Sequence, residues 1–432
     1  MDDFDVRSIG SLFEYTIPGE WGGDATPESG VPVLRATNFT DSGAIDYTDI
    51  VYREIPPSRL LSRRVTKGTI LIEKSGGGPS KPAGRVVFCD SHFSGCASNF
   101  VEIAKVKKGF DANFVFYLLY YLYQIGLVVK YQQQTTGIIN FKLDQYKDEK
   151  VSIPRSTAEQ TEIAAILTTI DKAISQTEAI IAKQQRIKTG LLQDLLTRGI
   201  DEHGNIRSEA THAFKDSPLG RIPAEWELKS LSDAFAMPPR NGIYKPAQQI
   251  GEGSLLIGQN AFTRDGTLDY ALARRAFVNA AELETFGLQE GDLLVSRVFA
   301  TADGVGKPVA VSDLPEPAVY ESNMLRLRFN TDCVHPGFVF HWLLSHQMRL
   351  AITSSVNASN QVSINQKTLN TLPIVIPKKC EQERILGVIV TATEAQLDLK
   401  RSLVKLRRNK SALMQDLLTG KVRVTPLLEA GA

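Results

Sequence analysis

Apolar residues recur every three or four positions along two long segments of the chain. The steps alternate between four and three from Ile163 to Leu195, and again from Ile385 to Leu417. This repeat of about 3.5 residues predicts two amphipathic helices, each with a narrow apolar seam of the kind that pairs in coiled coils. The residues predicted to form the seams are Ile163, Leu167, Ile170, Ile174, Ile181, Leu191 and Leu195 in the first helix and Ile385, Ile389, Leu399, Leu403, Leu406, Leu413 and Leu417 in the second.

The first helix has a clear start signal. Ser156-Thr157-Ala158-Glu159 has the sequence of a capping box, in which the serine accepts from a free backbone N–H and the glutamate reaches back. Each helix would be roughly 60 Å long at about 1.5 Å per residue. Both seams carry a lysine in the same slot, Lys188 and Lys410, and polar seam residues fix register and partner. We therefore favour two seams that face each other over two helices packed separately on their own globular parts. The residues leave open whether the pair is parallel or antiparallel.

The two helices belong to a duplication of the whole chain. Glu159-Gln160 returns 222 positions later as Glu381-Gln382, and Leu191–Thr197 returns as Leu413–Thr419 at the same offset. Matches upstream of the helices repeat at nearly the same distance. A period this long indicates two tandem modules rather than a solenoid. Two similar modules suit a ligand that itself has two similar halves.

Each helix follows a region of short β-like runs bounded by glycines. Thr69–Ile72 and Arg85–Phe88 are predicted strands, and Phe114–Val129 is a predicted buried helix. We therefore predict an α+β fold with two tandem mixed α/β modules, two long packed helices and a pseudo-two-fold internal repeat. The predicted segments are a globular domain at 1–153, a helix at 154–200, a linker at 201–225, a globular domain at 226–377, a helix at 378–420 and a tail at 421–432.

Composition narrows the class of protein. The chain is 43% hydrophobic and 22% charged, which is ordinary for a globular protein. It has no apolar run of the ~18 residues that span a bilayer, and its acidic N-terminus is unlike a secretory signal. We expect a cytoplasmic protein with no membrane contact. The net charge of +1 neither demands nor excludes nucleic acid.

The sequence shows no catalytic or metal-binding constellation. The glycine-rich stretches lack the Gly-Lys-Ser/Thr of a phosphate-binding loop, and no Gly-x-Ser-x-Gly elbow exists. Cys89, His92 and Cys96 lack the fourth ligand that structural zinc needs, so we expect no metal. A non-catalytic binding protein is the better class. The open alternatives are DNA recognition and a coiled-coil scaffold with two non-DNA binding modules.

Basic and amide side chains stand near strands and glycine-rich loops in both halves. Lys74 and Arg297 follow the repeated strand, and Lys81 and Lys307 each precede a proline in a glycine-rich loop. Arginine suits guanine, and asparagine or glutamine suits adenine. Each residue alone also fits an ordinary surface position, and the loops also fit plain turns. The candidate DNA-binding residues are Arg35, Asn38, Lys74, Lys81, Arg85, Arg240, Asn241, Tyr244, Lys245, Gln259, Asn260, Arg297 and Lys307.

Both helix regions resemble the specificity subunits of type I restriction–modification systems. Val151–Pro154 stands before Glu159-Gln160 and the first helix, and Ile374–Pro377 stands before the second. The second helix ends in the typical Leu-Leu-Thr-Gly, at Leu417–Gly420. Val33–Asn38 is similar to an early strand of this family. The departures are Arg198 in place of the first helix's final glycine, and Pro154-Arg155 and Pro377-Lys378 where the family usually has Pro-Pro.

The resemblance implies a division of labour. Each globular part would be a target-recognition domain that reads one half of a split sequence in double-stranded DNA. The helices would form an antiparallel spacer that sets the gap and docks modification (methyltransferase) subunits, two per chain. Those partners would hold S-adenosylmethionine and methylate adenine, and a restriction/motor subunit would complete the complex. This chain itself would carry no cofactor.

Overall fold

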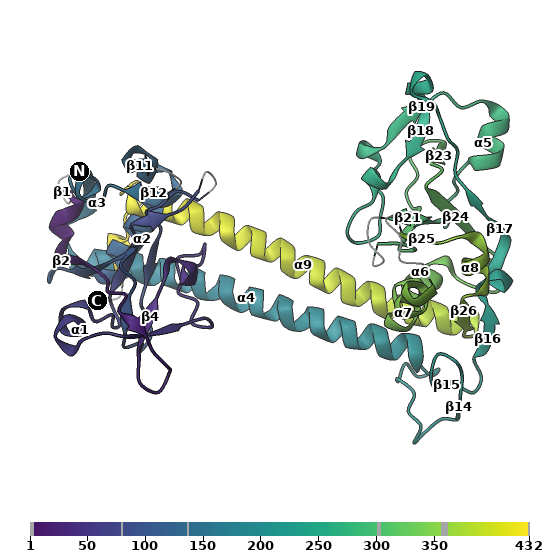
Figure 1. The fold of residues 1–432 in the computed structure, drawn as a ribbon, viewed down its shortest axis with the longest axis horizontal. Helices are drawn as coiled ribbons and strands as arrows, with labels where there is room; N and C mark the ends of the chain where they lie inside the picture. The colour runs from purple at the N-terminus through teal and green to yellow at the C-terminus, as the bar shows by residue number, and fades with distance from the viewer. Residues whose placement is uncertain (1–3, 79–80, 136–137, 300–303, 356–361, 431–432) are drawn as a thin grey trace. The chain divides into compact units, whose positions relative to one another are not determined.

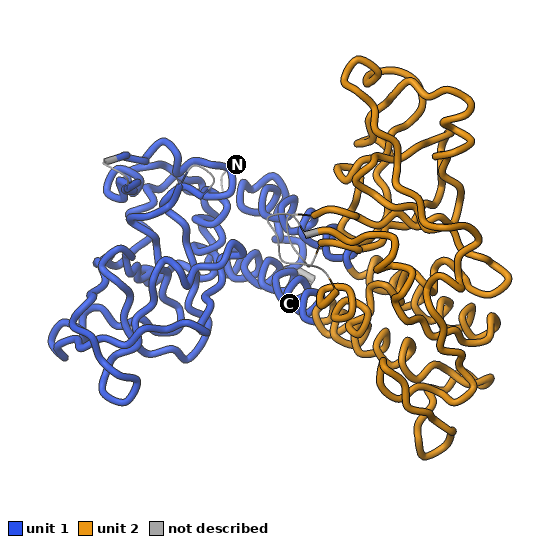
Figure 2. The backbone as a smooth tube through the Cα atoms, turned by 45° about the vertical axis from the view of Figure 1, so that its right-hand side comes forward, with its two compact units in different colours: residues 1–179, 400–432 blue, residues 180–399 orange. Residues whose placement is uncertain are grey.

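The computed structural model describes residues 4–78, 81–135, 138–299, 304–355 and 362–430. The chain forms two compact units, which Figure 2 shows in different colours. Unit 1 comprises residues 1–179 and 400–432, and unit 2 comprises residues 180–399. Each unit therefore contains one globular part together with one half of each long helix. No helix within the described ranges is both long enough and apolar enough to cross a membrane.

The centre of unit 1 is a four-stranded antiparallel sheet in the order β2-β10-β6-β8. Helix α2 packs against β8, and its aromatic residues fill the core because nearly every turn of α2 is buried. These elements are β2 (Phe13–Pro18), β6 (Ile70–Glu73), β8 (Val86–Phe88), β10 (Val101–Val106) and α2 (Ala112–Gln124).

Smaller sheets complete unit 1. One has the order β3-β5-β4-β9, with β4 and β9 parallel, and another has the order β11-β12-β7. Strand β1 pairs with β13 directly before the first long helix. The elements are β1 (Phe4–Ser8), β3 (Gly23–Asp24), β4 (Val31–Leu34), β5 (Val51–Glu54), α1 (Pro57–Arg63), β7 (Ser75–Gly76), β9 (Cys96–Ala97), β11 (Gln132–Thr135), β12 (Ile138–Phe141), α3 (Leu143–Lys147) and β13 (Lys150–Pro154).

Unit 2 repeats the central sheet and the main strand pairings of unit 1. Its central sheet has the order β17-β24-β20-β22, its β18 and β23 are parallel as β4 and β9 are, and its β16 pairs with β26 as β1 pairs with β13. The predicted duplication and α+β class are thus confirmed. The elements are β16 (Glu227–Ser230), β17 (Phe235–Asn241), β18 (Ile250–Ile257), β19 (Arg274–Ala276), α5 (Ala280–Phe286), β20 (Leu293–Ser296), β21 (Val298–Phe299), β22 (Pro308–Ala310), β23 (Ala318–Tyr320), β24 (Met324–Phe329), α6 (Pro336–Leu344), α7 (His346–Ser355), β25 (Val362–Ser363), α8 (Gln366–Thr371) and β26 (Pro373–Ile376).

The two long helices lie side by side and run in opposite directions within each unit (Figure 1). In unit 1, Asp171 pairs with Lys410 at 2.6 Å and Glu178 pairs with Arg407 at 2.7 Å. The partner number falls as the residue number rises, which is the signature of antiparallel pairing. The coiled-coil prediction is confirmed, with the orientation that the resemblance implied. The helices are α4 (Thr157–Thr197) and α9 (Lys379–Leu418). In unit 2, β14 (Phe214–Lys215) and β15 (Ile222–Pro223) follow α4, and in unit 1, α10 (Thr425–Ala430) follows α9.

None of the predicted seam residues is exposed. Leu167 and Leu195 are fully buried, and the seam residues in mid-helix, such as Ile181, are half-buried. The apolar core of unit 1 joins Leu167 of α4 to Leu417 of α9, and that of unit 2 joins Leu195 to Ile385. The seams therefore contribute to the two globular cores as well as to the helix pair.

The two seam lysines occupy equivalent places with different partners. Lys410 pairs with Asp171 and lies 4.7 Å from the ring centre of Tyr120. Lys188 donates to the Thr393 hydroxyl at 2.6 Å. Thr393 stands 222 positions after Asp171, as Lys410 does after Lys188. Each lysine thus selects one register, because a shift of either helix would bury its charge without a partner.

A buried ion pair closes the start of each long helix. The Glu381 carboxylate accepts from both terminal nitrogens of Arg207, from Trp226 Nε1 at 3.2 Å and from the Ile200 N–H at 3.1 Å. The equivalent Glu159 accepts from Arg423 Nε at 2.6 Å and Nη2 at 2.8 Å.

The closing arginines explain one difference from the sequence prediction. The Ser156 hydroxyl accepts from the Glu159 N–H at 3.4 Å, as the capping box requires. The Glu159 carboxylate, predicted to reach back to Ser156, is instead held by Arg423. A second difference concerns the helix predicted to run to Val129. Helix α2 ends at Gln124, because Gly126 adopts a left-handed conformation (φ +77°) that starts a separate 3-10 turn.

His341 should make the stability of unit 2 dependent on pH. Burial of this α6 side chain, and secondarily the nearby Lys188 charge, lowers its pKa from 6.5 to about 4. Between pH 6.5 and 4 the unfolded chain takes up a proton that the folded chain does not, so stability falls as the pH falls. We expect a loss on the order of 2 kcal/mol at pH 5 relative to pH 7. Urea unfolding of the wild type and of His341→Gln across this range checks it: the difference between the two should vary with pH, and a constant difference would contradict the assignment.

Candidate nucleic-acid interface

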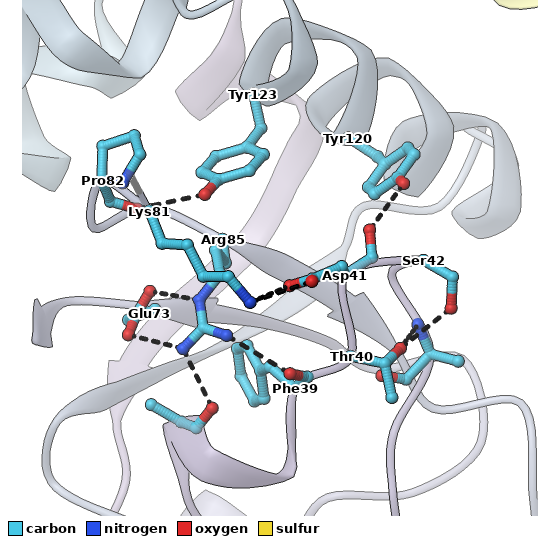
Figure 3. A network of polar contacts seen from close by, with 12 residues as sticks. Phe39, Thr40, Asp41, Ser42, Glu73, Lys81, Pro82, Arg85, Tyr120 and Tyr123 are labelled. Atoms are coloured by element: carbon cyan, nitrogen blue, oxygen red, sulfur yellow. Dashed lines mark hydrogen bonds and ion pairs between the residues drawn. The ribbon is translucent and has the colours of Figure 1, made fainter. Parts of the chain in front are cut away.

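Two candidate residues of unit 1, Lys81 and Arg85, lie in a network of ion pairs and tyrosines (Figure 3). Arg85 donates to both carboxylate oxygens of the fully buried Glu73, at 2.8 and 2.9 Å. The same guanidinium donates to the carbonyls of Ala36 at 3.0 Å and Phe39 at 3.3 Å. The hydrogen bond with Glu73 is the main reason that the pKa of Arg85 is raised. Arg85 therefore ties β6, β8 and a surface loop together.

The second cation of this network is Lys81. Its Nζ lies 2.7 and 2.9 Å from the two carboxylate oxygens of Asp41, and both side chains are exposed. Two hydroxyls of α2 close the network: Tyr120 donates to the Asp41 carbonyl at 2.9 Å and Tyr123 donates to the Pro82 carbonyl at 3.3 Å. Burial raises the pKa of Tyr120 to about 12, so this hydroxyl remains a donor at neutral pH. Unit 1 thus balances both cations of the network with its own carboxylates.

Other unit 1 candidates are also engaged within the unit. Asn38 is 2% exposed, and its amide accepts from the Arg35 N–H and donates to the carbonyls of Asp46 and Asp49. The Arg35 guanidinium pairs with the Asp49 carboxylate at 2.6 Å. Because the Asn38 amide forms these hydrogen bonds within the loop, it stabilises the loop and is not available to contact a base.

Lys74 lies at a different place from the Arg85 network. Its Nζ is 3.3 Å from Glu102, and both line a polar hollow of about 660 Å³ together with Gln133 and Lys142. A DNA contact by Lys74 stays a prediction.

In unit 2, the candidate residues at the end of β17 and just after it are partly buried and partly exposed. Lys245 is buried by its contact with Glu282, at 2.7 Å, which anchors α5. Tyr244 beside it is 78% exposed, and Arg240 and Asn241 are exposed as well. The exposed three can meet a ligand, whereas Lys245 serves the fold.

The remaining unit 2 candidates gather near one pocket. Gln259 and Lys307 both line a cavity of about 420 Å³, and Gln259 Nε2 donates to the Val298 carbonyl at 2.9 Å. Asn260 is exposed and donates to the Leu272 carbonyl. Arg297 is half-buried, and within the described ranges its Nε has no hydrogen-bond partner. The structure therefore brings Gln259 and Lys307 together, as the sequence did not.

The pocket also holds Arg264, a residue that sequence reasoning missed. Arg264 stands in a Thr-x-x-Gly turn, Thr263 to Gly266, that repeats Thr40 to Gly43 at an offset of 223. Following the duplication through this turn would have identified Arg264 as the unit 2 equivalent of Asp41, the partner of Lys81. For metal, the described ranges contain no group of three or more histidine, cysteine, aspartate or glutamate side chains that could hold an ion.

Comparison with known proteins assigns the family. The profile of the type I restriction modification DNA specificity domain matches residues 1–186 and 277–404, well over half of the chain. The protein therefore belongs to the specificity subunits of type I restriction–modification systems, as the sequence resemblance predicted. Members of this family recognise DNA and are not themselves catalytic. Of the two alternatives left open by the sequence, the family assignment therefore supports DNA recognition over a scaffold with two non-DNA binding modules.

Individual relatives match most or nearly all of the chain. The chain is 23% identical to the type I restriction enzyme MjaVIII specificity subunit of Methanocaldococcus jannaschii, over 99% of this chain and 94% of the relative. It is 24% identical to the EcoKI specificity subunit of Escherichia coli K12, over 82% of this chain and 74% of the relative.

Solved structures share the fold. A chain from a study of complex assembly in the type I restriction–modification system superposes with a TM-score of 0.61 at 14% identity, covering 98% of this chain and 99% of that one. The S subunit from M. genitalium gives a TM-score of 0.55 at 15% identity and 96% coverage of both chains.

Proposed function

We propose that each globular part reads one half of a bipartite sequence in double-stranded DNA, while α4 and α9 set the gap between the half-sites. The observation that carries this proposal is the repeated sheet order, β2-β10-β6-β8 and β17-β24-β20-β22, in two units that share one antiparallel helix pair. Two reading modules of one design suit a target made of two half-sites. Differences in their loops would give the half-sites different sequences.

The partners follow from the same duplication. Modification subunits would dock on the helix pair, two per chain, because each repeated helix offers an equivalent surface. They would hold S-adenosylmethionine and transfer its methyl group to adenine, and a restriction/motor subunit would join the assembly. This chain would determine the DNA sequence specificity of the complex and hold no cofactor of its own.

Charge predicts how the assembly binds. Phosphate contacts supply most protein–DNA affinity and weaken steeply as salt rises. This chain has a net charge of +1, and several of its cations are already paired with carboxylates. The isolated chain should therefore bind DNA only modestly, and the modification subunits should strengthen binding.

Domain exchange tests the proposal. The chain is co-expressed with the modification subunit of its own system, and methylated adenines are mapped across the host genome. A split motif is expected. Replacing residues 1–153 with the corresponding segment of a relative should change one half of the motif completely and leave the other half and the gap intact.

The reciprocal exchange of residues 226–377 is the matched control and should change only the other half. Random or absent methylation with the unaltered chain would reject the proposal. A change of both half-sites by a single exchange would reject the assignment of one half-site to each unit.

A further inference from the structure

One basic residue holds the same place in both units. Lys74 directly follows β6, and Arg297 directly follows β20. In each case the N–H of this residue donates to the carbonyl that directly precedes β10 or β24, and its own carbonyl accepts from an N–H further along the chain. These backbone partners are Phe100 and Phe141 for Lys74, each at 2.8 Å, and Asn323 and Ile364 for Arg297, each at 2.9 Å. The backbone therefore fixes where both side chains begin.

The strand pairing identifies a second pair of equivalent positions. Two residues before the basic residue of unit 1, β6 pairs with Glu102 of β10, which pairs on its other side with Pro18 of β2. Two residues before the basic residue of unit 2, β20 pairs with Leu325 of β24, which pairs on its other side with Asn241 of β17. Leu325 is thus the counterpart of Glu102, and Asn241 is the counterpart of Pro18.

In unit 1 a carboxylate neutralises the basic residue. The Lys74 Nζ lies 3.3 Å from Glu102, whose side chain is only 7% exposed. In unit 2 the counterpart of this carboxylate is Leu325, which is fully buried and carries no charge. The ion pair of unit 1 therefore has no equivalent at this position of unit 2.

The Arg297 guanidinium forms no hydrogen bond or ion pair with the residues that the structure describes. Its Nε is buried, and only its two terminal nitrogens remain open to a ligand. Residues paired across strands share one face of a sheet, as do residues two apart along a strand, so Arg297 and Asn241 lie on the same face. Asn241 is exposed. This end of the unit 2 sheet thus presents both an arginine and an asparagine to solvent.

The accessible atoms of Arg297 match one base. Two guanidinium N–H groups side by side can donate to the O6 and N7 acceptors of guanine, whereas adenine and thymine do not present two adjacent acceptors in the major groove. The buried Nε and the two backbone hydrogen bonds restrict the guanidinium to few positions. Such a restricted group suits one base edge better than the uniform phosphates of the backbone, which carry no sequence information.

We propose that Arg297 reads a guanine in the half-site that unit 2 recognises. The inference deepens the proposed function and rests on it, because it assigns one base pair of that half-site to one side chain. It predicts a G·C pair at one position of the half-site and a preference at that position that depends on the guanidinium.

The test uses the chain assembled with its modification subunits and the split motif found by methylation mapping. Exchange of residues 226–377 identifies the half-site of unit 2. Binding is then measured on the motif duplex and on duplexes in which each base pair of that half-site is replaced in turn. The wild type should lose affinity roughly tenfold to a hundredfold when the contacted G·C pair is replaced. Arg297→Met should lose the same factor on the intact motif and should not distinguish base pairs at that position.

Two further variants control for folding and for charge. Arg297→Gln keeps a polar end on a side chain of similar length and should also lose the preference for G·C. Both Arg297 variants should keep the wild-type discrimination in the half-site of unit 1, which shows that the chain is folded and assembled. Arg275→Met is the matched control, because this exposed arginine of unit 2 is already paired with Glu316. It should bind every duplex as the wild type does.

An Arg297→Met variant that still discriminates at every position of the unit 2 half-site would overturn the inference. So would a half-site without a G·C pair, an equal loss on all duplexes, which identifies a phosphate contact, or the same loss in Arg275→Met. If the wild type methylates a split motif and Arg297→Met leaves its recognition intact, only this inference fails. If the wild type methylates no split motif, the proposed function fails and the inference fails with it.

Discussion

Replacing Arg207 with methionine should destabilise unit 2 by about 3–5 kcal/mol, because it leaves the Glu381 carboxylate buried without its cation. The Glu381 side chain is 2% exposed and that of Arg207 is 5% exposed, so water cannot take the place of the guanidinium. The Trp226 N–H and the Ile200 N–H would remain as donors, and neither carries a charge.

Tryptophan fluorescence can follow this unfolding transition. Trp226 and Trp342 are buried in unit 2, and the third tryptophan, Trp21, lies in unit 1, so a Trp21→Phe background isolates unit 2. In urea, the midpoint of Arg207→Met should fall sharply. Adding Glu381→Leu should recover part of the loss, because the unpaired charge is removed.

An exposed ion pair provides the control for this substitution. Lys229 and Glu227 pair at 2.6 Å with both side chains in solvent, so Lys229→Met should change stability by no more than about 0.5 kcal/mol. A loss below about 1 kcal/mol in Arg207→Met would show that the buried pair does not hold the start of α9 in place.

Lengthening both helices by seven residues should widen the gap of the DNA motif by about three base pairs and leave both half-sites unchanged. Seven residues add about 10 Å of helix, and base pairs are spaced about 3.4 Å apart. Duplicating Ser175–Ile181 in α4 and Thr393–Leu399 in α9 preserves the seam, because seven residues are two turns of a 3.5-residue repeat. Methylation mapping reads the gap directly.

The control is a seven-residue insertion after Gly204, in the exposed turn of the linker. This insertion has the same length and does not alter either helix, so the gap should stay as in the wild type. A gap that does not respond to the paired helix insertions would contradict the spacer function of α4 and α9.

Periodicity and repetition made most of the fold predictable. The seam positions follow from spacing alone, because a residue every 3.5 positions must face one side of a helix. The duplication extended this reasoning, since each prediction for one half applied to the other. Residue spacing did not predict the direction of pairing. The contacts of Lys410 with Asp171 and of Lys188 with Thr393 form only in the antiparallel arrangement. Residue spacing along one helix carries no information about the partner's direction.

The candidate site was less predictable, because residue type does not reveal which partner a charge has. Arg85 was selected as a DNA contact, and the structure shows its guanidinium on Glu73, a strand away. Asn38 has the amide that suits adenine, yet this amide is already hydrogen-bonded to backbone groups of its own loop. The unit 2 pocket brings Arg264 together with Gln259 and Lys307, and the positions of these residues along the chain do not reveal that they line one cavity.

The pair formed by Glu159 and Arg423 makes the segment after α9 a working part of unit 1. Arg423 also lies 5.1 Å from the ring centre of Phe4, so this one guanidinium meets residues from β1 and from the start of α4. A protease nick just after Gly420 would leave both long helices whole. Loss of the segment beyond the nick would nevertheless leave the buried Glu159 carboxylate without its cation and Phe4 without its guanidinium, and so destabilise the globular part of unit 1.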